Sequence, residues 1–223
     1  MPPRTMAKYD IAILGGDRRT ACMAPVLAEK GYRVVCFRTV SIPCGSSIKS
    51  KLAFTDSLRE ALDSAPVIIG GIPFTRSGSL YCEENTSDAA VSISELQRGI
   101  RKHQKIFAGV IPEDFRKTCE EREISCHDFM LDEPMTLYNA VSTAEGAILE
   151  ALLHKDTNLH MSNTLVLGYG RCGKILADRL KGLHACVTVC SNDACELALA
   201  CALGFETLHL SKLWNNICCY EYI

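Results

Sequence analysis

One short stretch constrains the fold of this chain more than any other. An apolar run at residues 164–167 breaks into the pattern Gly-x-Gly-x-x-Gly and resumes with helical spacing. In such a pattern Gly168 permits a tight turn, Gly170 lets a pyrophosphate approach the backbone, and Gly173 lets the helix pack closely on the strand. The first N–H groups of the helix then face an anion. The stretch therefore predicts a strand, a turn and a helix that can hold phosphate.

The residues that follow favour a dinucleotide site. A predicted helix at residues 174–181 is followed by Gly182, and a β-rich run at residues 185–190 completes the βαβ unit that the pattern requires. The alternative is a structural glycine turn without a ligand, because ordinary loops also contain such glycines. We expect six consecutive residues to contact the cofactor: Gly168, Tyr169, Gly170, Arg171, Cys172 and Gly173.

The end of the second predicted strand indicates which dinucleotide binds. A carboxylate there accepts a hydrogen bond from a ribose 2′-hydroxyl, whereas NADP needs room and donors for a phosphate. Ser191 and Asn192 can donate to a phosphate, although Asp193 follows and no arginine is adjacent. We expect these three residues to contact the cofactor, and they favour NADP, with NAD as the alternative.

Composition narrows the class of protein. The 223 residues are 48% hydrophobic with a mean hydropathy of +0.08, which predicts a folded protein of one large or two small domains. A net charge of −2 gives no overall positive field, so nucleic acid and membrane surfaces are poor candidate partners. No signal peptide or membrane-spanning run is recognisable, which favours the cytoplasm. The thirteen cysteines are scattered without a Cys-x-x-Cys pair, so we expect no metal site.

A second glycine turn lies near the N-terminus. A strand at residues 9–14 runs into Gly-Gly-Asp-x-Arg, and a helix at residues 20–30 and a strand at residues 32–37 follow. Asp17 would repel a pyrophosphate, whereas Arg18 or Arg19 could hold a substrate carboxylate bidentately. We expect a substrate to contact Gly16, Asp17 and Arg19. The alternative is a solvated turn in which Asp17 caps the helix.

Helices and strands continue to alternate along the chain. Further helices are predicted at residues 56–65, 92–102 and 112–122, and further strands at residues 66–73, 105–110 and 124–128. The pattern predicts an α/β fold with two doubly wound parallel-sheet domains, at residues 1–138 and 139–223. A polar loop at residues 75–87 follows one strand at the carboxyl edge, where such sheets bind ligands.

A connecting helix is predicted at residues 138–154, with Ser142 or Thr143 as its cap. In two-domain dehydrogenases the cleft-side end of such a connector lines the active site. We therefore expect substrate contacts from Asn139, Ser142, Thr143 and Glu145, although Glu145 taken alone is better explained as a capping carboxylate in the first turn. No residue stands out as a catalytic base, because His127, His154 and His160 have no visible partner.

Three motifs together carry a family resemblance: Gly-Gly-Asp-x-Arg at residues 15–19, Asn-x-x-x-Thr-Ala-Glu-Gly-Ala at residues 139–147, and Leu-Gly-Tyr-Gly-Arg-x-Gly at residues 167–173. In this order and spacing they resemble the A subunit of dipicolinate synthase. The resemblance implies a flavodoxin-like N-terminal domain and an NAD(P)-binding Rossmann domain. It also implies a flavoprotein-like B subunit of dipicolinate synthase as partner, a homo-oligomer, and oxidation of a dihydrodipicolinate precursor to pyridine-2,6-dicarboxylate for spores.

The chain departs from that family in two respects. Asn192 stands where the family often carries an arginine, which affects the choice of dinucleotide. The sequence also stops at the opening of a fourth strand, so we expect a C-terminally truncated, incomplete Rossmann domain that is inactive alone. Two alternatives remain from the sequence: an enzyme of the D-2-hydroxyacid or alanine dehydrogenase type, and a non-catalytic dinucleotide-binding interaction module.

Overall fold

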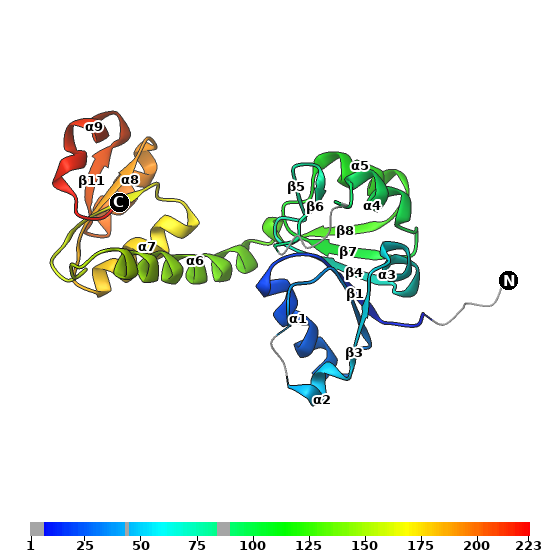
Figure 1. Ribbon diagram of the computed structural model, residues 1–223. Coiled ribbons are helices and arrows are strands. Elements are labelled where there is room, and N and C mark those ends of the chain that lie inside the picture. The colour runs from blue at the N-terminus through cyan, green and yellow to red at the C-terminus, as the bar shows by residue number, and fades with distance from the viewer. Residues whose placement is uncertain (1–6, 43–44, 84–89) are drawn as a thin grey trace. The chain divides into compact units, whose positions relative to one another are not determined.

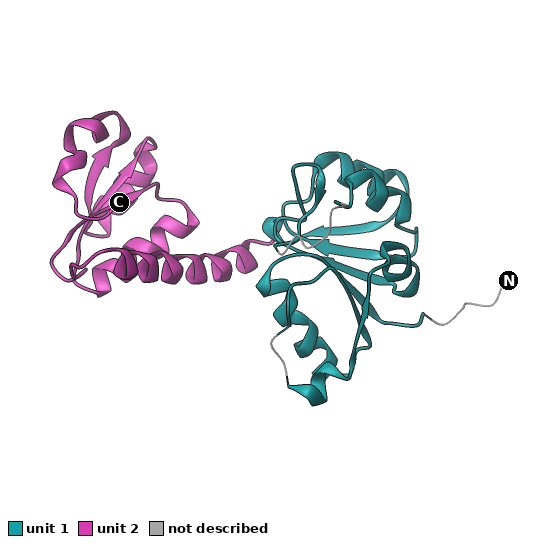
Figure 2. Cartoon of the chain, viewed as in Figure 1, with its two compact units in different colours: residues 1–131 teal, residues 132–223 magenta. Residues whose placement is uncertain are grey.

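The chain divides into two compact units, Met1–Leu131 and Asp132–Ile223 (Figure 2). The computed structural model describes residues 7–42, 45–83 and 90–223. The second unit begins with helix α6 (Glu133–His154). The domain boundary predicted from the sequence, between residues 138 and 139, falls inside this helix.

The first unit is built on a six-stranded sheet whose neighbouring strands are all parallel (Figure 1). The order is β3-β2-β1-β4-β7-β8, which gives five strands a flavodoxin-like order and adds β3 outside β2. Strand β3 was not predicted from the sequence. The strands are β1 (Ile11–Leu14), β2 (Val34–Phe37), β3 (Leu52–Thr55), β4 (Val67–Gly70), β7 (Lys105–Ala108) and β8 (Ser125–Asp128).

Helices cover both faces of this sheet, which confirms the predicted doubly wound α/β class. A short hairpin, β5 (Thr75–Arg76) with β6 (Ser79–Leu80), follows β4. The helices are α1 (Arg18–Glu29), α2 (Ser46–Lys49), α3 (Leu58–Ser64), α4 (Ile93–Gly99), α5 (Glu113–Glu121) and the 3₁₀ turn η1 (Phe129–Leu131).

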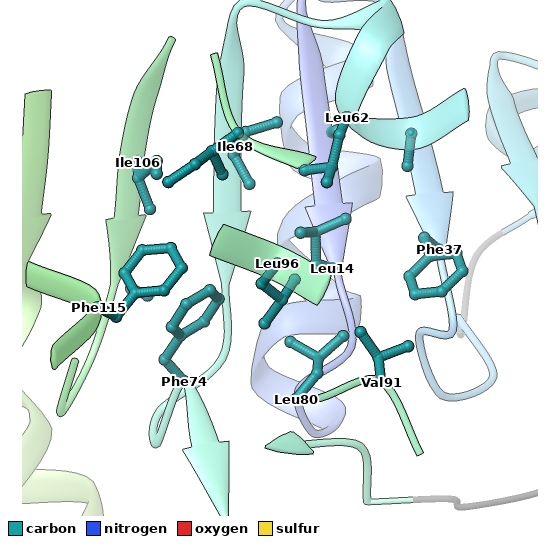
Figure 3. Close-up of a cluster of buried hydrophobic side chains, with 14 of the residues drawn as sticks. Leu14, Phe37, Leu62, Ile68, Phe74, Leu80, Val91, Leu96, Ile106 and Phe115 are labelled. Atoms are coloured by element: carbon teal, nitrogen blue, oxygen red, sulfur yellow. The ribbon is translucent and has the colours of Figure 1, made fainter. Parts of the chain in front are cut away.

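Strand β1 shows why the sheet lies at the centre of the unit. All four of its residues are buried, as expected for a parallel strand covered on both faces. Because side chains alternate along a strand, Ala12 and Leu14 enter one apolar cluster and Ile11 and Ile13 enter the other. Figure 3 shows the first of these clusters, with labelled side chains Leu14, Phe37, Leu62, Ile68, Phe74, Leu80, Val91, Leu96, Ile106 and Phe115.

The second unit contains a three-stranded parallel sheet in the order β11-β10-β9. Beside this sheet, Tyr222 forms an isolated parallel bridge with Thr164 of β9. A separate apolar cluster includes Val166, Ala177 and Val189. The elements after α6 are β9 (Asn163–Leu167), α7 (Arg171–Gly182), β10 (Cys186–Ser191), α8 (Ala194–Ala202), β11 (Glu206–His209), η2 (Leu210–Lys212), α9 (Leu213–Asn216) and η3 (Ile217–Cys219).

The start of α6 differs from the sequence prediction. Asp132 is the N-cap, and its side chain accepts a hydrogen bond from the backbone N–H of Met135 at 3.0 Å. Pro134 lies in the first turn, where a missing N–H costs nothing. The prediction that Ser142 or Thr143 caps this helix is therefore wrong, because both lie well inside it.

In the described ranges 7–42, 45–83 and 90–223, no helix is both long and apolar enough to cross a membrane. The same residues contain no group of three or more His, Cys, Asp or Glu side chains placed to hold a metal ion. The described cysteines are free thiols, and Cys44 lies outside the described residues.

Candidate functional site

The glycine turn of the second unit connects β9 to α7. Gly168 adopts a φ of +88°, a left-handed conformation that favours glycine, and its N–H donates to the carbonyl of Cys190 at 2.7 Å. Gly170 is the N-cap of α7, and its carbonyl accepts the first helical hydrogen bond, from Lys174, at 3.0 Å. The predicted strand, turn and helix are thus present at the predicted residues.

The three glycines differ in what the fold requires of them. Gly168 needs its positive φ, and a Cβ atom on Gly173 would lie 2.1 Å from the carbonyl oxygen of Gly168. Gly170 has an ordinary φ of −74°, and a Cβ atom there would meet no atom within 4 Å. The fold therefore demands glycine at positions 168 and 173, whereas at position 170 it leaves open space.

The start of α7 presents backbone donors to that space. No side chain of the described residues caps this helix, because its N-cap is a glycine. The N–H groups of Arg171, Cys172 and Gly173 belong to the first helical turn, whose donors have no partner inside a helix. The helix dipole adds positive potential at the same place. The residues present at this turn thus fit an anion such as a pyrophosphate.

The side chains of the turn play different parts from one another. Tyr169 is only 1% exposed and packs edge-on against Phe205 with ring centroids 6.1 Å apart, so only its backbone can contact a cofactor. Burial also raises the pKa of its hydroxyl. Arg171 is exposed and forms a bidentate ion pair with Glu133 of α6, at 3.0 and 2.7 Å. Cys172 is exposed.

The tip of β10 is an internal hydrogen-bond network. The Ser191 hydroxyl donates to Oε2 of Glu196 at 2.6 Å and accepts from the N–H of Asp193 at 3.1 Å. Asp193 caps α8 by accepting from the N–H groups of Cys195 and Glu196. Asn192, between Ser191 and Asp193, is exposed. Glu196 was not among the predicted site residues, although a carboxylate in the first turn after the strand tip was visible in the sequence.

The N-terminal turn has the predicted cap at Asp17, whose carboxylate accepts the backbone N–H of Arg19 at 2.9 Å. Gly15 and Gly16 both have positive φ, at 53° and 85°. A Cβ atom on Gly16 would also lie 2.3 Å from the Thr20 hydroxyl. The glycines are thus needed to bring the chain from β1 into α1.

The Arg19 guanidinium is bonded within this turn. Its Nε and Nη2 donate to Asp17 Oδ2 at 3.0 and 2.6 Å, and Nη2 also donates to the carbonyl of Ile72 at 2.8 Å. Burial works to raise the pKa of Asp17, but the hydrogen bonds and charge of Arg19 outweigh it and hold that pKa below its usual value. Asp17 caps the helix, as the solvated-turn alternative expects, whereas a substrate contact of Arg19 stays a prediction.

An open pocket lies on the hairpin next to this turn. Its volume is about 710 Å³. The Arg76 guanidinium lies over the Tyr81 ring, 4.6 Å from its centroid, and the N–H of Arg18 donates to Glu83 at 3.2 Å. The pocket is lined by Arg76, Ser77, Ser79, Leu80, Tyr81, Cys82, Glu83 and Ala90. Residues 84–87 of the predicted polar loop lie outside the described residues.

The four candidate residues on α6 lie along the body of the helix. The Thr143 hydroxyl donates to the carbonyl of Asn139 one turn earlier, at 3.1 Å, which brings these two residues together. Ser142 and Glu145 are exposed. The buried side of the helix consists of Thr136, Ala140 and Ala144, so the candidate residues are not needed for its packing.

The three histidines considered as catalytic bases, His127, His154 and His160, each contact another side chain. His127 stacks on Phe107 with ring centroids 4.9 Å apart and contacts the Ser125 hydroxyl at 2.8 Å. His154 lies 3.3 Å from the carboxylate of Glu150. His160 packs edge-on against His184.

Comparison with known proteins identifies the family. The family described as the N-terminal domain of the dipicolinate synthase A subunit matches residues 10–130. The A subunit of dipicolinate synthase from Bacillus subtilis is 23% identical over 207 residues, which cover 93% of this chain and 69% of the relative. The match at residues 10–130 includes the first glycine turn and the sheet that carries it.

Solved structures agree with the fold. The dipicolinate synthase A subunit from Bacillus halodurans has a TM-score of 0.71 at 20% identity and covers 95% of this chain and 71% of that one. The A chain of dipicolinate synthase from Bacillus subtilis has a TM-score of 0.67 at 23% identity and covers 94% of this chain and 70% of that one. A transhydrogenase from Sinorhizobium meliloti has a TM-score of 0.58 at 14% identity, with coverage of 95% and 68%. The solved structures show the same fold, and the family match over more than half of its residues establishes that the chain belongs to the dipicolinate synthase A-subunit family.

Proposed function

We propose that this protein is an oxidoreductase subunit that binds a nicotinamide dinucleotide at the glycine turn between β9 and α7. The observation that carries the proposal is Gly170, where the backbone conformation is ordinary and a side chain would enter open space. A glycine without a structural reason, beside uncapped helix donors, is explained by the close approach of a pyrophosphate to the backbone. Arg171 adds an exposed guanidinium at the same helix start.

The proposed reaction is oxidation of a dihydrodipicolinate-type ring, in support of sporulation, and its product is the dipicolinate that the family name gives. The bound nicotinamide would supply the hydride acceptor. The work of the protein is then to hold the ring and its two carboxylates in line with that acceptor and to exclude water.

The proposed substrate contacts come from two places. In the first unit they are Gly16, Asp17 and Arg19, where the guanidinium would share its donors between Asp17 and a substrate carboxylate. The acidic Asp17 disfavours phosphate at the same turn. On α6 the proposed contacts are Asn139, Ser142, Thr143 and Glu145.

A partner polypeptide is part of the proposal. The relatives are named as A subunits, which implies at least one further kind of subunit in their complexes. We propose that a flavoprotein-like B subunit joins this chain in the active complex and that copies of this chain associate as a homo-oligomer.

Titration calorimetry with NAD⁺ and NADP⁺ tests the cofactor site. Gly170→Val should abolish the binding of both, because the added methyl groups occupy the space over the helix start. Gly146→Val is the matched control, because Gly146 is exposed on α6 and its Cβ would also meet no atom within 4 Å. Binding to Gly170→Val as tight as to the parent chain would contradict the proposed site.

A further inference from the structure

The chain that leaves the β5–β6 hairpin is bonded to the N-terminal glycine turn. The N–H of Gly16 donates to the carbonyl of Tyr81 at 2.7 Å, and the N–H of Glu83 donates to the carbonyl of Gly16 at 3.0 Å. A Cβ atom on Gly15 would lie 2.5 Å from the Tyr81 carbonyl oxygen, so this close approach requires glycine. The residues that follow β6 are therefore held beside the turn that leads to Arg19.

The same hairpin orients the side chain of Arg76. Arg76 of β5 pairs with Ser79 of β6, which puts Tyr81 diagonally opposite Arg76 on the same face of the hairpin. The exposed Arg76 guanidinium lies over the Tyr81 ring, 4.6 Å from its centroid. A guanidinium stacked on a ring keeps its N–H groups at its edge, where a carboxylate can accept them. Among the described residues, no hydrogen bond or ion pair occupies the N–H groups of Arg76.

Tyr81 and Glu83 lie near Arg19 as well as near Arg76. Both line the open pocket of about 710 Å³ on the hairpin, together with Arg76. The hydrogen bonds to Asp17 are the main cause that raises the pKa of Arg19, and Tyr81 and Glu83 add to the rise because both are negative at the high pH where arginine titrates. Two guanidinium groups thus lie close to Tyr81, beyond the carboxyl end of β4, where parallel sheets bind ligands.

We infer that Arg76 binds one carboxylate of a dicarboxylate ligand whose other carboxylate is held by Arg19. The inference rests on the proposed substrate contact of Arg19 and adds to it a residue from the hairpin. A planar guanidinium holds a carboxylate through two parallel N–H bonds, so two such groups favour a ligand with two carboxylates over a ligand with one. The hydroxyl groups of Ser77 and Ser79 line the same pocket and can donate to the same anion.

The charge of Glu83 opposes this binding. Its carboxylate lines the pocket and accepts the backbone N–H of Arg18 at 3.2 Å, a donor without charge. Asp17, in contrast, is neutralised by its ion pair with Arg19. Removing the charge of Glu83 should therefore strengthen the binding of a dianion, whereas removing the charge of Arg76 should weaken it.

Calorimetric titration of the 223-residue chain with pyridine-2,6-dicarboxylate and with pyridine-2-carboxylate tests the inference. The parent chain should bind the dicarboxylate at least about tenfold more tightly, as expected for one additional charged hydrogen-bond partner. Arg76→Gln should remove most of this preference by weakening dicarboxylate binding, and Glu83→Gln should strengthen that binding by about two- to fivefold. Arg98→Gln is the matched control, because it removes the same charge from an exposed position on α4 and should leave both affinities unchanged.

The opposite effects expected of Arg76→Gln and Glu83→Gln exclude a loss of structure as their common cause. A parent chain that binds the two ligands equally, or an Arg76→Gln variant that keeps the full preference, would overturn the inference. Equal losses in Arg76→Gln and Arg98→Gln would also overturn it, because they would show a response to net charge alone.

Titration of the same parent sample with NAD⁺ and NADP⁺ separates this inference from the proposed cofactor site. Dinucleotide binding without a preference for the dicarboxylate would overturn the role of Arg76 and leave the cofactor site in place. A preference for the dicarboxylate that Arg76→Gln removes, without binding of either dinucleotide, would support the role of Arg76 and contradict the cofactor site.

Discussion

A Cβ atom on Gly173 would lie 2.1 Å from the carbonyl oxygen of Gly168, which is far inside van der Waals contact. The approach brings the first turn of α7 directly against the end of β9. The same approach places the backbone donors of that turn beside the open space at Gly170. The close packing at Gly173 thus brings the N–H groups of α7 to the open space at Gly170, where we propose that the pyrophosphate binds.

Gly173→Ala should therefore destabilise the protein, because neither backbone can move without separating α7 from β9. We expect a loss of about 1–3 kcal/mol in the free energy of unfolding, the usual cost of overpacking a tight contact. Gly170→Ala is the control and should change stability by less than about 0.5 kcal/mol. Denaturant unfolding measures both. Equal stabilities of the two variants would show that the contact relaxes freely.

The start of α6 gives a second prediction about stability. Asp132→Ala should cost about 1 kcal/mol, because it removes the side chain that caps the helix. Ser142→Ala should change stability by less than about 0.5 kcal/mol, because Ser142 is exposed inside the helix. Thermal or denaturant unfolding compares the two. A larger loss of stability in Ser142→Ala than in Asp132→Ala would indicate that Ser142 caps the helix, as the sequence predicted.

The elements that the sequence predicted share a clear local signal. β1 and β2 are short apolar runs, each flanked by a glycine turn or helix, and both are buried along their whole length. β3 gave no such signal, because only Leu52 of its four residues is buried and Phe54 is 54% exposed at the sheet edge.

The candidate site was predictable to the extent that it depends on adjacent residues. The glycine turn could be predicted because its pattern is contiguous. The two hydrogen bonds that Glu196 accepts could not be predicted, since their donors, Tyr169 and Ser191, lie in other segments. The burial of Tyr169 was equally hidden, because a variable position in the pattern does not indicate which way its side chain points.

The lowered pKa of Asp17 predicts a dependence of stability on pH. A carboxyl whose pKa is lower in the folded state stabilises the fold above its unfolded pKa, about 3.9, and loses this contribution as pH falls through the folded pKa. Asp17→Asn retains a capping side chain but has no charge to titrate. The stability difference between the parent and Asp17→Asn should therefore shrink below about pH 4.

Denaturant unfolding of both proteins between about pH 6 and pH 3 measures this change. Asp156→Asn provides a control for the removal of a carboxylate from an exposed loop. A stability difference between the parent and Asp17→Asn that stays constant over this range would show that the ion pair with Arg19 does not shift the titration of Asp17.

Arg19→Lys tests the proposed carboxylate clamp. Lysine keeps the charge but loses the planar pair of donors that bonds Asp17. The free energy of unfolding should fall by less than about 1 kcal/mol, because the arginine side chain is 56% exposed. Turnover by the complex with the proposed B subunit should fall about ten- to a hundredfold, as expected for the loss of about 1.5–3 kcal/mol of charged hydrogen bonding.

Steady-state kinetics and a circular dichroism melt separate the two roles of Arg19. Unchanged kinetics would leave Arg19 as a helix-cap partner of Asp17. A collapsed melt would instead make it a structural residue of the turn. Arg59→Lys is a suitable control, because Arg59 is 88% exposed and pairs only with Asp63 among the described residues.

The ion pair between Arg171 and Glu133 should weaken dinucleotide binding. It engages the Arg171 guanidinium, which lies beside the proposed pyrophosphate site. Glu133→Gln removes the competing charge, so dinucleotide affinity should rise by about two- to fivefold, within the range of about 0–1 kcal/mol for exposed pairs. The gain should shrink at high salt. Glu150→Gln, which removes an exposed charge from the same helix, should leave affinity unchanged. Weaker binding by Glu133→Gln would show instead that Glu133 holds Arg171 in its binding position.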